Sequence, residues 1–250
     1  MTHADDAGPS NGAPRARTEL GRFFRAALVD PVEPERPETA SALIRRRVAV
    51  AVTAVMGAVA LGLTLAIRPG DVLFYPAMLG VAAVWAGGAL ASGRLRLGRA
   101  RTRAGATSRS VLQGVILGGV LLAVFLAGAV AVARIPVLRG PVDALLDHAR
   151  FGSIAVVTVL TVVNGVAEEL FFRGATFAAL PARWRIAGST LLYAATTLFT
   201  GIPLLTFAAA CLGVLTAFQR RVTGGVLGPI ATHLTWSIGM LWLLPFAFAL

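Results

Sequence analysis

Residues 163–173 read VNGVAEELFFR and close an apolar run that is long enough to cross a bilayer. Two adjacent carboxylates and an arginine inside a membrane helix are costly to bury, and such groups are functional by default. Glu169 and Arg173 stand at i and i+4 with the acid before the base, the favourable order for an ion pair. Glu168 lies off that pair and shares a face with Asn164. The stretch therefore predicts a structural ion pair beside a carboxylate available for acid–base chemistry; the alternative is that both acids cap the helix at the lipid headgroups.

The composition is that of a membrane protein. Of the 250 residues, 56% are hydrophobic and 14% are charged, and the mean hydropathy is +0.76. The net charge of +11 comes from 23 arginines with no lysine, and most of these arginines lie between apolar runs. Such clusters indicate membrane orientation rather than nucleic-acid binding. The single cysteine, Cys211, falls inside an apolar run, so an intramolecular disulfide is excluded and packing is its expected role.

Seven apolar runs predict an all-α, polytopic protein with seven membrane crossings. The runs occupy residues 48–67, 72–93, 110–133, 151–172, 186–200, 203–219 and 229–248. Alternate loops carry fourteen arginines against four, and arginine-rich loops stay on the cytoplasmic side. We therefore expect a multi-pass protein of the cell membrane with its N-terminus inside and its C-terminus outside. The end of run 151–172 that bears Glu168 and Glu169 then faces the cytoplasmic leaflet.

Residues 1–44 differ from the rest of the chain, because they hold seven of the twelve acids together with many prolines and glycines. Such a composition cannot bury a core, so we expect a mostly disordered cytoplasmic tail before a transmembrane domain at 45–250. The tail lacks the apolar region and cleavage site of a signal peptide, so the first run is expected to be an uncleaved anchor. Residues 18–29 space their apolar side chains along one helical face. They predict either an amphipathic helix on the membrane surface or a transient helix without a role.

The first three apolar runs carry no intramembrane charge. Gly114 and Gly118 form a GxxxG pattern in the third run, which favours close packing against another helix. These runs are therefore expected to be scaffold.

A second group of polar residues lies in the last apolar run. Pro229 suits the first turn of a helix, and His233 and Ser237 follow as i and i+4 neighbours on one face. His233 begins its helix about as far from the cytoplasmic face as Glu168 ends its own. A lone membrane histidine can equally be a hydrogen-bonded packing residue. In the fifth run Tyr193 and Thr197 are also i and i+4 neighbours, and for these hydroxyls contact between helices is the favoured interpretation.

These motifs together resemble the CPBP family of intramembrane proteases, which includes type II CAAX prenyl proteases and Abi bacteriocin-immunity proteins. The resemblance covers about residues 151–247 and rests on three motifs: EExxxR at 168–173, QRRxTGG at 219–225 and GPxxxHxxxS at 228–237. It implies an endopeptidase that hydrolyses peptide bonds near the cytoplasmic leaflet with a glutamate-activated water. Carried onto this chain, it makes Glu168 the base, with Glu169 and Arg173 supporting it and His233 donating to the oxyanion.

Two positions depart from the family pattern. Thr197 stands where the second motif has a histidine, and Ser237 replaces the asparagine of the third motif. A threonine hydroxyl orients water but does not titrate near neutrality, so Glu168 would have to carry proton transfer alone. Loss of an acid–base partner typically lowers a rate by about 10² to 10⁴-fold. The alternative is therefore a non-catalytic relative that binds a membrane peptide or partner in an immunity or regulatory role.

Two further interpretations are weaker. A catalytic zinc site usually takes three ligands rich in histidine, and this region offers one histidine with two carboxylates, one already paired with Arg173; we therefore expect no cofactor. A proton-coupled transporter would place charge more widely and show a repeat between its halves. The expected partners are the lipid bilayer and a peptide or membrane-protein substrate, with no nucleic acid. The sequence indicates neither the cleavage site nor an oligomeric state.

Overall fold

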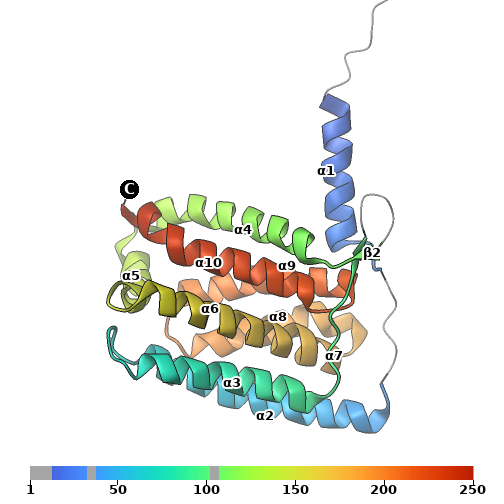
Figure 1. The fold of residues 1–250 in the computed structure, drawn as a ribbon, viewed down its shortest axis with the longest axis horizontal. Helices are drawn as coiled ribbons and strands as arrows, with labels where there is room; N and C mark the ends of the chain where they lie inside the picture. Colours follow the sequence, from blue (N-terminus) through green and yellow to red (C-terminus); the bar gives the residue numbers. More distant parts are fainter. Residues whose placement is uncertain (1–12, 33–37, 102–106, 250) are drawn as a thin grey trace, which may run out of the picture.

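A computed structural model describes residues 13–32, 38–101 and 107–249 (Figure 1). The chain forms a bundle in which seven helices run alternately in opposite directions, with their connecting loops at two ends (Figure 1). These helices are α2 (Ala40–Leu65), α3 (Phe74–Ser92), α4 (Val111–Val132), α6 (Ile154–Glu169), α8 (Arg185–Leu198), α9 (Pro203–Thr223) and α10 (Leu227–Ala249). Each corresponds to one of the seven apolar runs. The prediction of an all-α, polytopic membrane protein is confirmed.

Within the described residues, six of these helices are long and apolar enough to cross a membrane. The exception is α8, which has 14 residues and is therefore about 21 Å long, shorter than a typical crossing. The loop after α8 supplies the missing length, because the Phe199 carbonyl lies against Gly62 near the far end of α2. The expected seven crossings thus become six full-length spans and one short helix that still connects the two ends.

The fourth span is longer than its apolar run. After α6 the chain continues through a π-helical segment, η1 (Leu170–Thr176), and a last turn, α7 (Phe177–Ala179). A short 3-10 turn, η2 (Ala182–Trp184), then leads into α8. π-helical turns are rare and frequently occur at functional sites. Here the π turn begins directly after the two glutamates.

The connection between the third and fourth spans contains helix α5 (Pro136–Arg150), which the sequence did not predict. Its apolar face, which includes Val142 and Leu146, packs into a small core with α4 and α10. Its polar face carries charge pairs, such as the 3.3 Å contact between Arg139 and Asp143. The helix is amphipathic and begins with a proline, but Gly140 and Pro141 in its sequence obscured that pattern.

The N-terminal helix α1 (Ala13–Leu28) runs across the direction of the bundle helices at the end where α2 begins (Figure 1). It includes most of the predicted amphipathic stretch 18–29, and it starts earlier. Its last turn is attached to the bundle, because Ala27 is fully buried and Nη2 of Arg221 donates to the Leu28 carbonyl at 3.3 Å. Residues 1–12 and 33–37 of the predicted disordered tail lie outside the described residues.

A two-stranded hairpin, which the sequence did not predict, lies at the same end of the bundle as α1. Strand β1 (Ala100–Arg101) pairs antiparallel with strand β2 (Thr107–Ser108). The hairpin belongs to the long arginine-rich loop between α3 and α4. Two residues in each strand are too few to form a sheet layer, so the architecture remains helical.

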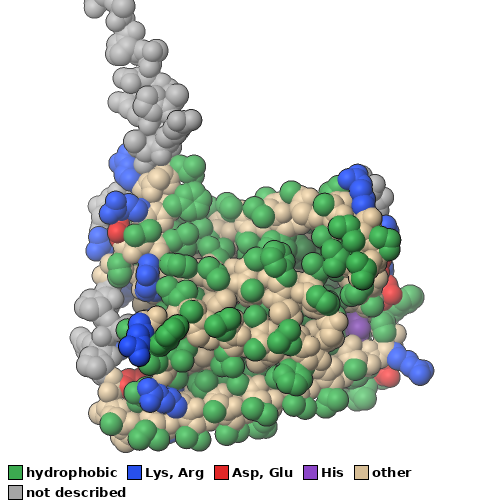
Figure 2. All heavy atoms as spheres, turned by 180° about the vertical axis from the view of Figure 1, so that it is seen from behind, with side chains coloured by type: hydrophobic (Ala, Val, Ile, Leu, Met, Phe, Trp, Pro, Cys, Tyr) green, Lys and Arg blue, Asp and Glu red, His purple; other side chains and the backbone are tan. Residues whose placement is uncertain are grey.

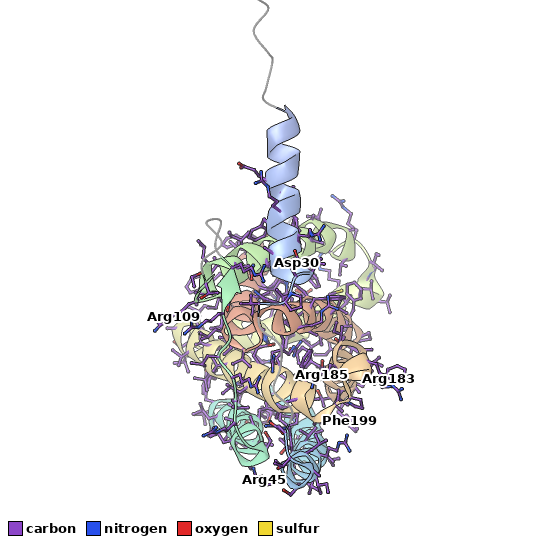
Figure 3. All side chains as sticks on the ribbon, turned by 90° about the vertical axis from the view of Figure 1, so that its right-hand side faces the viewer. Asp30, Arg45, Arg109, Arg183, Arg185 and Phe199 are labelled. Carbon is purple, nitrogen blue, oxygen red and sulfur yellow. The ribbon has the colours of Figure 1, made fainter. Side chains whose placement is uncertain are left out.

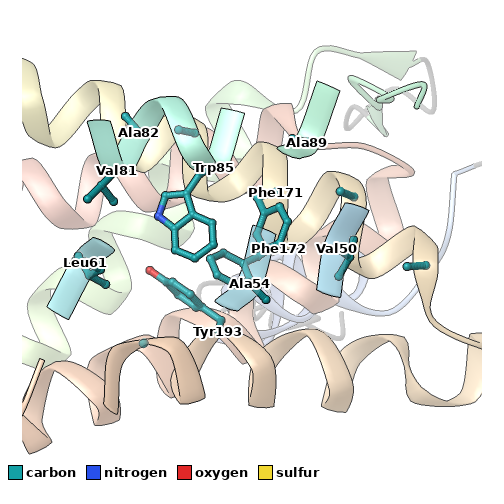
Figure 4. Packing of buried hydrophobic residues seen from close by; sticks show 14 of the residues in the cluster. Val50, Ala54, Leu61, Val81, Ala82, Trp85, Ala89, Phe171, Phe172 and Tyr193 are labelled. Carbon is teal, nitrogen blue, oxygen red and sulfur yellow. The ribbon is translucent and has the colours of Figure 1, made fainter. Parts of the chain in front are cut away.

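The core contains a group of aromatic side chains, Trp85, Phe171, Phe172 and Tyr193, packed among aliphatic ones (Figure 4). The ring of Trp85 from α3 lies 5.0 Å from that of Phe171 and 5.1 Å from that of Phe172, and Phe172 lies 4.6 Å from Tyr193 of α8. The outer surface along the middle of the bundle is largely hydrophobic, whereas arginines gather mostly at the end where α1 attaches (Figure 2). An apolar band between charged ends is the surface that a bilayer requires.

Helix α4 is more than scaffold, because its predicted GxxxG face is where α10 packs. A Cβ atom at Gly114 or Gly118 would overlap the backbone of α10 around Thr232. The Thr232 hydroxyl lies 3.1 Å from the Gly114 carbonyl and 2.7 Å from Oε1 of Gln219. Glycines on α4 therefore set the position of the helix that carries His233.

Candidate active site

Glu169 lies between two basic side chains in the interior of the bundle. Its Oε2 is 3.3 Å from Nε of Arg173, and both side chains are fully buried. Its Oε1 is 2.9 Å from Nδ1 of His233 on α10. The sequence predicted the first contact from the i, i+4 spacing. The second contact links α6 to α10, and makes Glu169 an anchor for the imidazole ring.

Glu168 has different neighbours and is the more accessible of the two acids. The Tyr193 hydroxyl donates to Oε2 of Glu168 at 2.7 Å. The same oxygen lies 3.9 Å from Nε2 of His233, and 17% of the Glu168 side chain is exposed. This separation is too long for a direct hydrogen bond, but one water molecule can contact both atoms. Glu168 is thus held on one side and open on the other.

Small residues allow the helices of the site to approach each other. A Cβ atom at Gly165, one turn before Glu169, would lie 3.8 Å from Nε2 of His233 and 3.0 Å from the side chain of Leu234. A larger residue at this position would therefore push α10 away from α6. The glycine explains how a histidine on α10 reaches between two carboxylates at the end of α6.

The remaining predicted residues lie near this group or one turn away. Asn164 is buried one turn before Glu168, and its Nδ2 donates to the Leu160 carbonyl at 3.0 Å. Thr197 is one turn beyond Tyr193, and its hydroxyl lies 2.7 Å from the Ala194 carbonyl and 3.1 Å from Oγ1 of Thr206. Ser237 lies one turn beyond His233 on α10. The structure therefore brings Glu168, Glu169, Arg173, Tyr193 and His233 together, and it directs the Thr197 hydroxyl toward α9.

Sequence reasoning gave too little weight to Tyr193 and missed Arg220. The ring of Tyr193 lies under the Arg173 guanidinium, whose Cζ is 4.6 Å from the ring centroid, and its hydroxyl reaches Glu168. Arg220 of α9 is buried. Its Nε donates to the Arg173 carbonyl at 2.8 Å, and its Cζ lies 5.0 Å from the centroid of the Phe177 ring. Arg220 belongs to the QRRxTGG motif, so the sequence indicated that the position matters but did not predict its contact with the Arg173 carbonyl.

The site holds two acidic side chains, Glu168 and Glu169, beside two basic ones, Arg173 and His233. Buried charges are tolerated when they are paired and hydrogen-bonded. Among the described residues, no group of three or more His, Cys, Asp or Glu side chains is arranged to hold a metal ion. The arrangement suits proton transfer with a hydrogen-bond donor opposite the base.

Comparison with known protein families finds a match, which covers the part of the chain that contains this site. Residues 150–239 match the family described as type II CAAX prenyl endopeptidase Rce1-like. No curated protein and no solved structure gives a significant match to the chain. The matched residues contain all three motifs and every side chain of the site from Asn164 to Ser237. Residues 150–239 are therefore similar to the type II CAAX prenyl endopeptidases, in agreement with the resemblance of the motifs to the CPBP family of intramembrane proteases.

Proposed function

We propose that this protein hydrolyses peptide bonds at the arginine-rich end of the bundle, with Glu168 as the general base that activates a water molecule. The observation that carries this proposal is the position of His233, whose two ring nitrogens face the two adjacent glutamates at 2.9 and 3.9 Å. One glutamate is buried and orients the ring, and the other is partly exposed and faces its second nitrogen. This division of roles suits a base and an electrophilic donor on opposite sides of one reacting group.

The proposed reaction begins with a water molecule between Glu168 and the peptide carbonyl. Glu168 takes a proton from the water while the water oxygen forms a bond to the carbonyl carbon. The carbonyl oxygen becomes an oxyanion, which accepts a hydrogen bond from Nε2 of His233. Glu168 then returns the proton to the leaving nitrogen as the carbon–nitrogen bond breaks, giving a carboxyl and an amine. Proton transfer by a placed side chain typically contributes about 10² to 10⁴-fold, and one oxyanion donor about 10² to 10³-fold.

Each remaining side chain has a positioning role in this proposal. Glu169 accepts a hydrogen bond from the Nδ1–H of His233, and in this proposal Nε2 also carries a proton, which it donates to the oxyanion. Arg173 compensates the charge that Glu169 brings into the bundle, and Tyr193 holds Oε2 of Glu168. No step requires a metal, so we expect cleavage to persist in the presence of a chelator such as 1,10-phenanthroline.

The first test compares wild type with Glu168→Gln, which preserves shape and removes the base. The purified protein is incubated in detergent or nanodiscs with an unmodified peptide library and with peptides that carry an isoprenylated cysteine near the C-terminus. We expect Glu168→Gln to reduce cleavage by at least about a hundredfold while thermal stability is unchanged. Cleavage at the wild-type rate by Glu168→Gln would exclude the glutamate mechanism.

Thr197 provides the complementary variant. In the wild type its hydroxyl is bonded to Ala194 and Thr206 rather than to either glutamate. We expect Thr197→His to raise the rate, because it adds a titratable ring one turn from Tyr193. Thr197→Val is the matched control, because it keeps the shape and removes the hydroxyl, and it should leave the rate unchanged.

The second candidate function is non-catalytic binding of a membrane peptide or partner. Two features of Thr197 favour this function. Thr197 replaces the second histidine of the family pattern, and its hydroxyl contacts the Ala194 carbonyl and Thr206 rather than the glutamates. Under this alternative neither wild type nor Thr197→His cleaves any peptide, whereas peptides that bind wild type lose affinity when Glu168 is changed.

A further inference from the structure

Asn164 is a buried polar residue of α6 to which the proposed reaction gives no role. It is 5% exposed, and its Nδ2 donates to the Leu160 carbonyl at 3.0 Å. Its Oδ1 is also buried, and among the described residues it has no hydrogen-bond partner. A buried amide oxygen without a donor lowers stability. This oxygen is therefore suited to accept a hydrogen bond from a bound molecule.

Asn164 lies at the same level of the bundle as the acid and the imidazole of the site. Helical side chains tilt toward the N-terminus of their helix, so the Glu168 carboxylate lies over the turn that contains Asn164 and Gly165. Two distances agree with this placement. Nε2 of His233 is 3.9 Å from Oε2 of Glu168, and it is 3.8 Å from the position that a Cβ atom would take at Gly165. Asn164 is the residue directly before this glycine.

Asn164 and His233 lie on opposite sides of Glu168 around α6. Gly165 and Glu169 both face His233. At about 100° per residue, these two positions are rotated from Glu168 by about 60° and about 100° in one direction. Asn164 is rotated from Glu168 by about 40° in the other direction. Glu168 is therefore flanked by the imidazole on one side and by the amide on the other.

The Asn164 side of α6 faces the interior of the bundle. Figure 3 looks along the bundle and shows the helices of the site between α4 above and α2 and α3 below. Helix α6 packs against both α3 and α10, and Tyr193 of α8 reaches Glu168 from a third side. On the outer face of α6, in contrast, Val159 and Val163 are 60% and 38% exposed. The unpaired oxygen of Asn164 thus belongs to the site and not to the lipid-facing surface.

A trans peptide group matches this arrangement of donor and acceptor. In a trans peptide the N–H points in the direction opposite to the C=O. In the proposed reaction the carbonyl oxygen of the cleaved bond accepts from Nε2 of His233, so the N–H of the same bond points to the other side of Glu168. Asn164 lies on that side, and a carboxamide oxygen is an ordinary acceptor for a backbone N–H.

We propose that Oδ1 of Asn164 accepts a hydrogen bond from the N–H of the peptide bond that is cleaved. This inference rests on the proposed roles of Glu168 and His233. The two hydrogen bonds fix the plane of the peptide group, with its carbonyl carbon beside the water molecule on Glu168. When the carbon–nitrogen bond breaks, the nitrogen takes the proton from Glu168 and keeps its hydrogen bond to Asn164. The site thereby selects amides, because an ester has no N–H to offer.

The test compares a cleaved peptide of the library with its ester analogue, in which an oxygen atom replaces the N–H of the cleaved bond. The variant is Asn164→Leu, which keeps the shape of the side chain. We expect Asn164→Leu to lower kcat/KM for the amide about tenfold and to change kcat/KM for the ester less than about twofold. The matched control is Gln113→Met. Gln113 is another buried amide whose oxygen has no described partner, and it lines a cavity beside α1. The ester-to-amide ratio should not change in this control.

The ester-to-amide ratio is measured on one preparation, so it does not depend on the fraction of folded protein. If Asn164→Leu does not fold, Asn164→Ala gives the same comparison. Equal losses for the amide and the ester would overturn the proposal and make Asn164 a structural residue that acts through the Leu160 carbonyl. Unchanged cleavage of the amide by the folded variant would exclude the contact.

Failure of the proposed reaction gives a different result. If wild type cleaves no peptide, each amide of the library peptide that binds most tightly is replaced in turn by an ester, and binding to wild type and to Asn164→Leu is measured. We expect one ester analogue to bind wild type about tenfold more weakly than the amide peptide and both to bind Asn164→Leu alike. Wild-type affinity that is the same for every analogue, or no binding of any peptide, would exclude the hydrogen bond to Asn164.

Discussion

At the scale of single residues, the site depends on one carboxylate with two basic neighbours. Glu169 is fully buried between Arg173 and His233, and its contacts hold the ring that faces Glu168. Glu169 is therefore a positioning residue in the proposed reaction, although its contact with His233 is shorter than that of Glu168. The exposed fraction of the Glu168 side chain, not the number of its contacts, marks it as the group that meets water.

Removal of Arg173 tests the ion pair. Arg173→Ala removes the guanidinium beside the buried Glu169 and leaves only His233 next to it, so we expect the free energy of unfolding to fall by about 3–5 kcal/mol, the range for breaking a buried pair. The measurement is thermal or denaturant unfolding of the purified protein in detergent. Arg183→Ala, at an exposed position in η2, is the control and should change stability little. Wild-type stability of Arg173→Ala would argue against the pair.

Glu38 gives a prediction about the stability of the protein at acidic pH. Its pKa is lowered mainly by its hydrogen bonds to Arg46, so the folded state binds this proton less readily than the unfolded state. The stabilisation is therefore complete above the usual glutamate pKa of about 4.3 and is lost as the pH falls through the lower folded value. Glu38→Gln should lose this part of the pH dependence, which difference curves of unfolding against pH would show. If the curves of wild type and Glu38→Gln superimpose, the Glu38–Arg46 pair does not contribute to the loss of stability at low pH.

At the scale of elements, the packing of α4 against α10 positions the active site. Gly118→Ala places a methyl group against the Thr232 backbone, so we expect overpacking to destabilise the protein by about 1–3 kcal/mol and to reduce cleavage by moving His233. The matched control is Gly119→Ala, because a Cβ atom there meets nothing within 4 Å; it should be neutral or slightly stabilising. Unfolding and activity assays on both variants decide the question. Equal behaviour of the two alanine variants would mean that α10 is positioned by other contacts.

Elements also show how far the sequence could be interpreted. Hydrophobic periodicity located every bundle helix, because apolar length is what the membrane selects. It missed α5, whose amphipathic face is interrupted by Gly140 and Pro141, and it ended the fourth span too early. Helical spacing predicted the contact of Glu169 with Arg173, whereas the contact of Glu169 with His233 joins two helices and follows from packing at Gly165 and Gly118. Thr197 could be placed on the face of Tyr193, but its bond to Thr206 required the position of α9.

At the scale of the whole molecule, the arginines predict the orientation in the membrane. We expect reporters fused after Arg109 and after Arg183 to be cytoplasmic and one fused after Arg139 to be external, because arginine-rich loops stay inside. A reporter after Gly201 tests whether the short helix α8 takes the chain across; it should be external. Alkaline phosphatase and fluorescent-protein fusions give opposite signals on the two sides. One common side for Arg109 and Arg139 would rule out this topology.

The π-helical turn after the glutamates has a consequence for the register of the chain. A π turn closes its hydrogen bond over one more residue than an α turn, and one residue corresponds to about 100° of rotation around a helix. The segment from Leu170 to Thr176 therefore changes the direction in which the side chains after it point, relative to those before it. Before it, the helix directs Glu168 and Glu169 toward α10; after it, the same helix presents Phe177 and the Ala179 carbonyl to arginines. Deletion of one residue here would leave Glu168, Glu169, Phe177 and Ala179 in the chain but rotate one of the two faces by about 100° away from its partners.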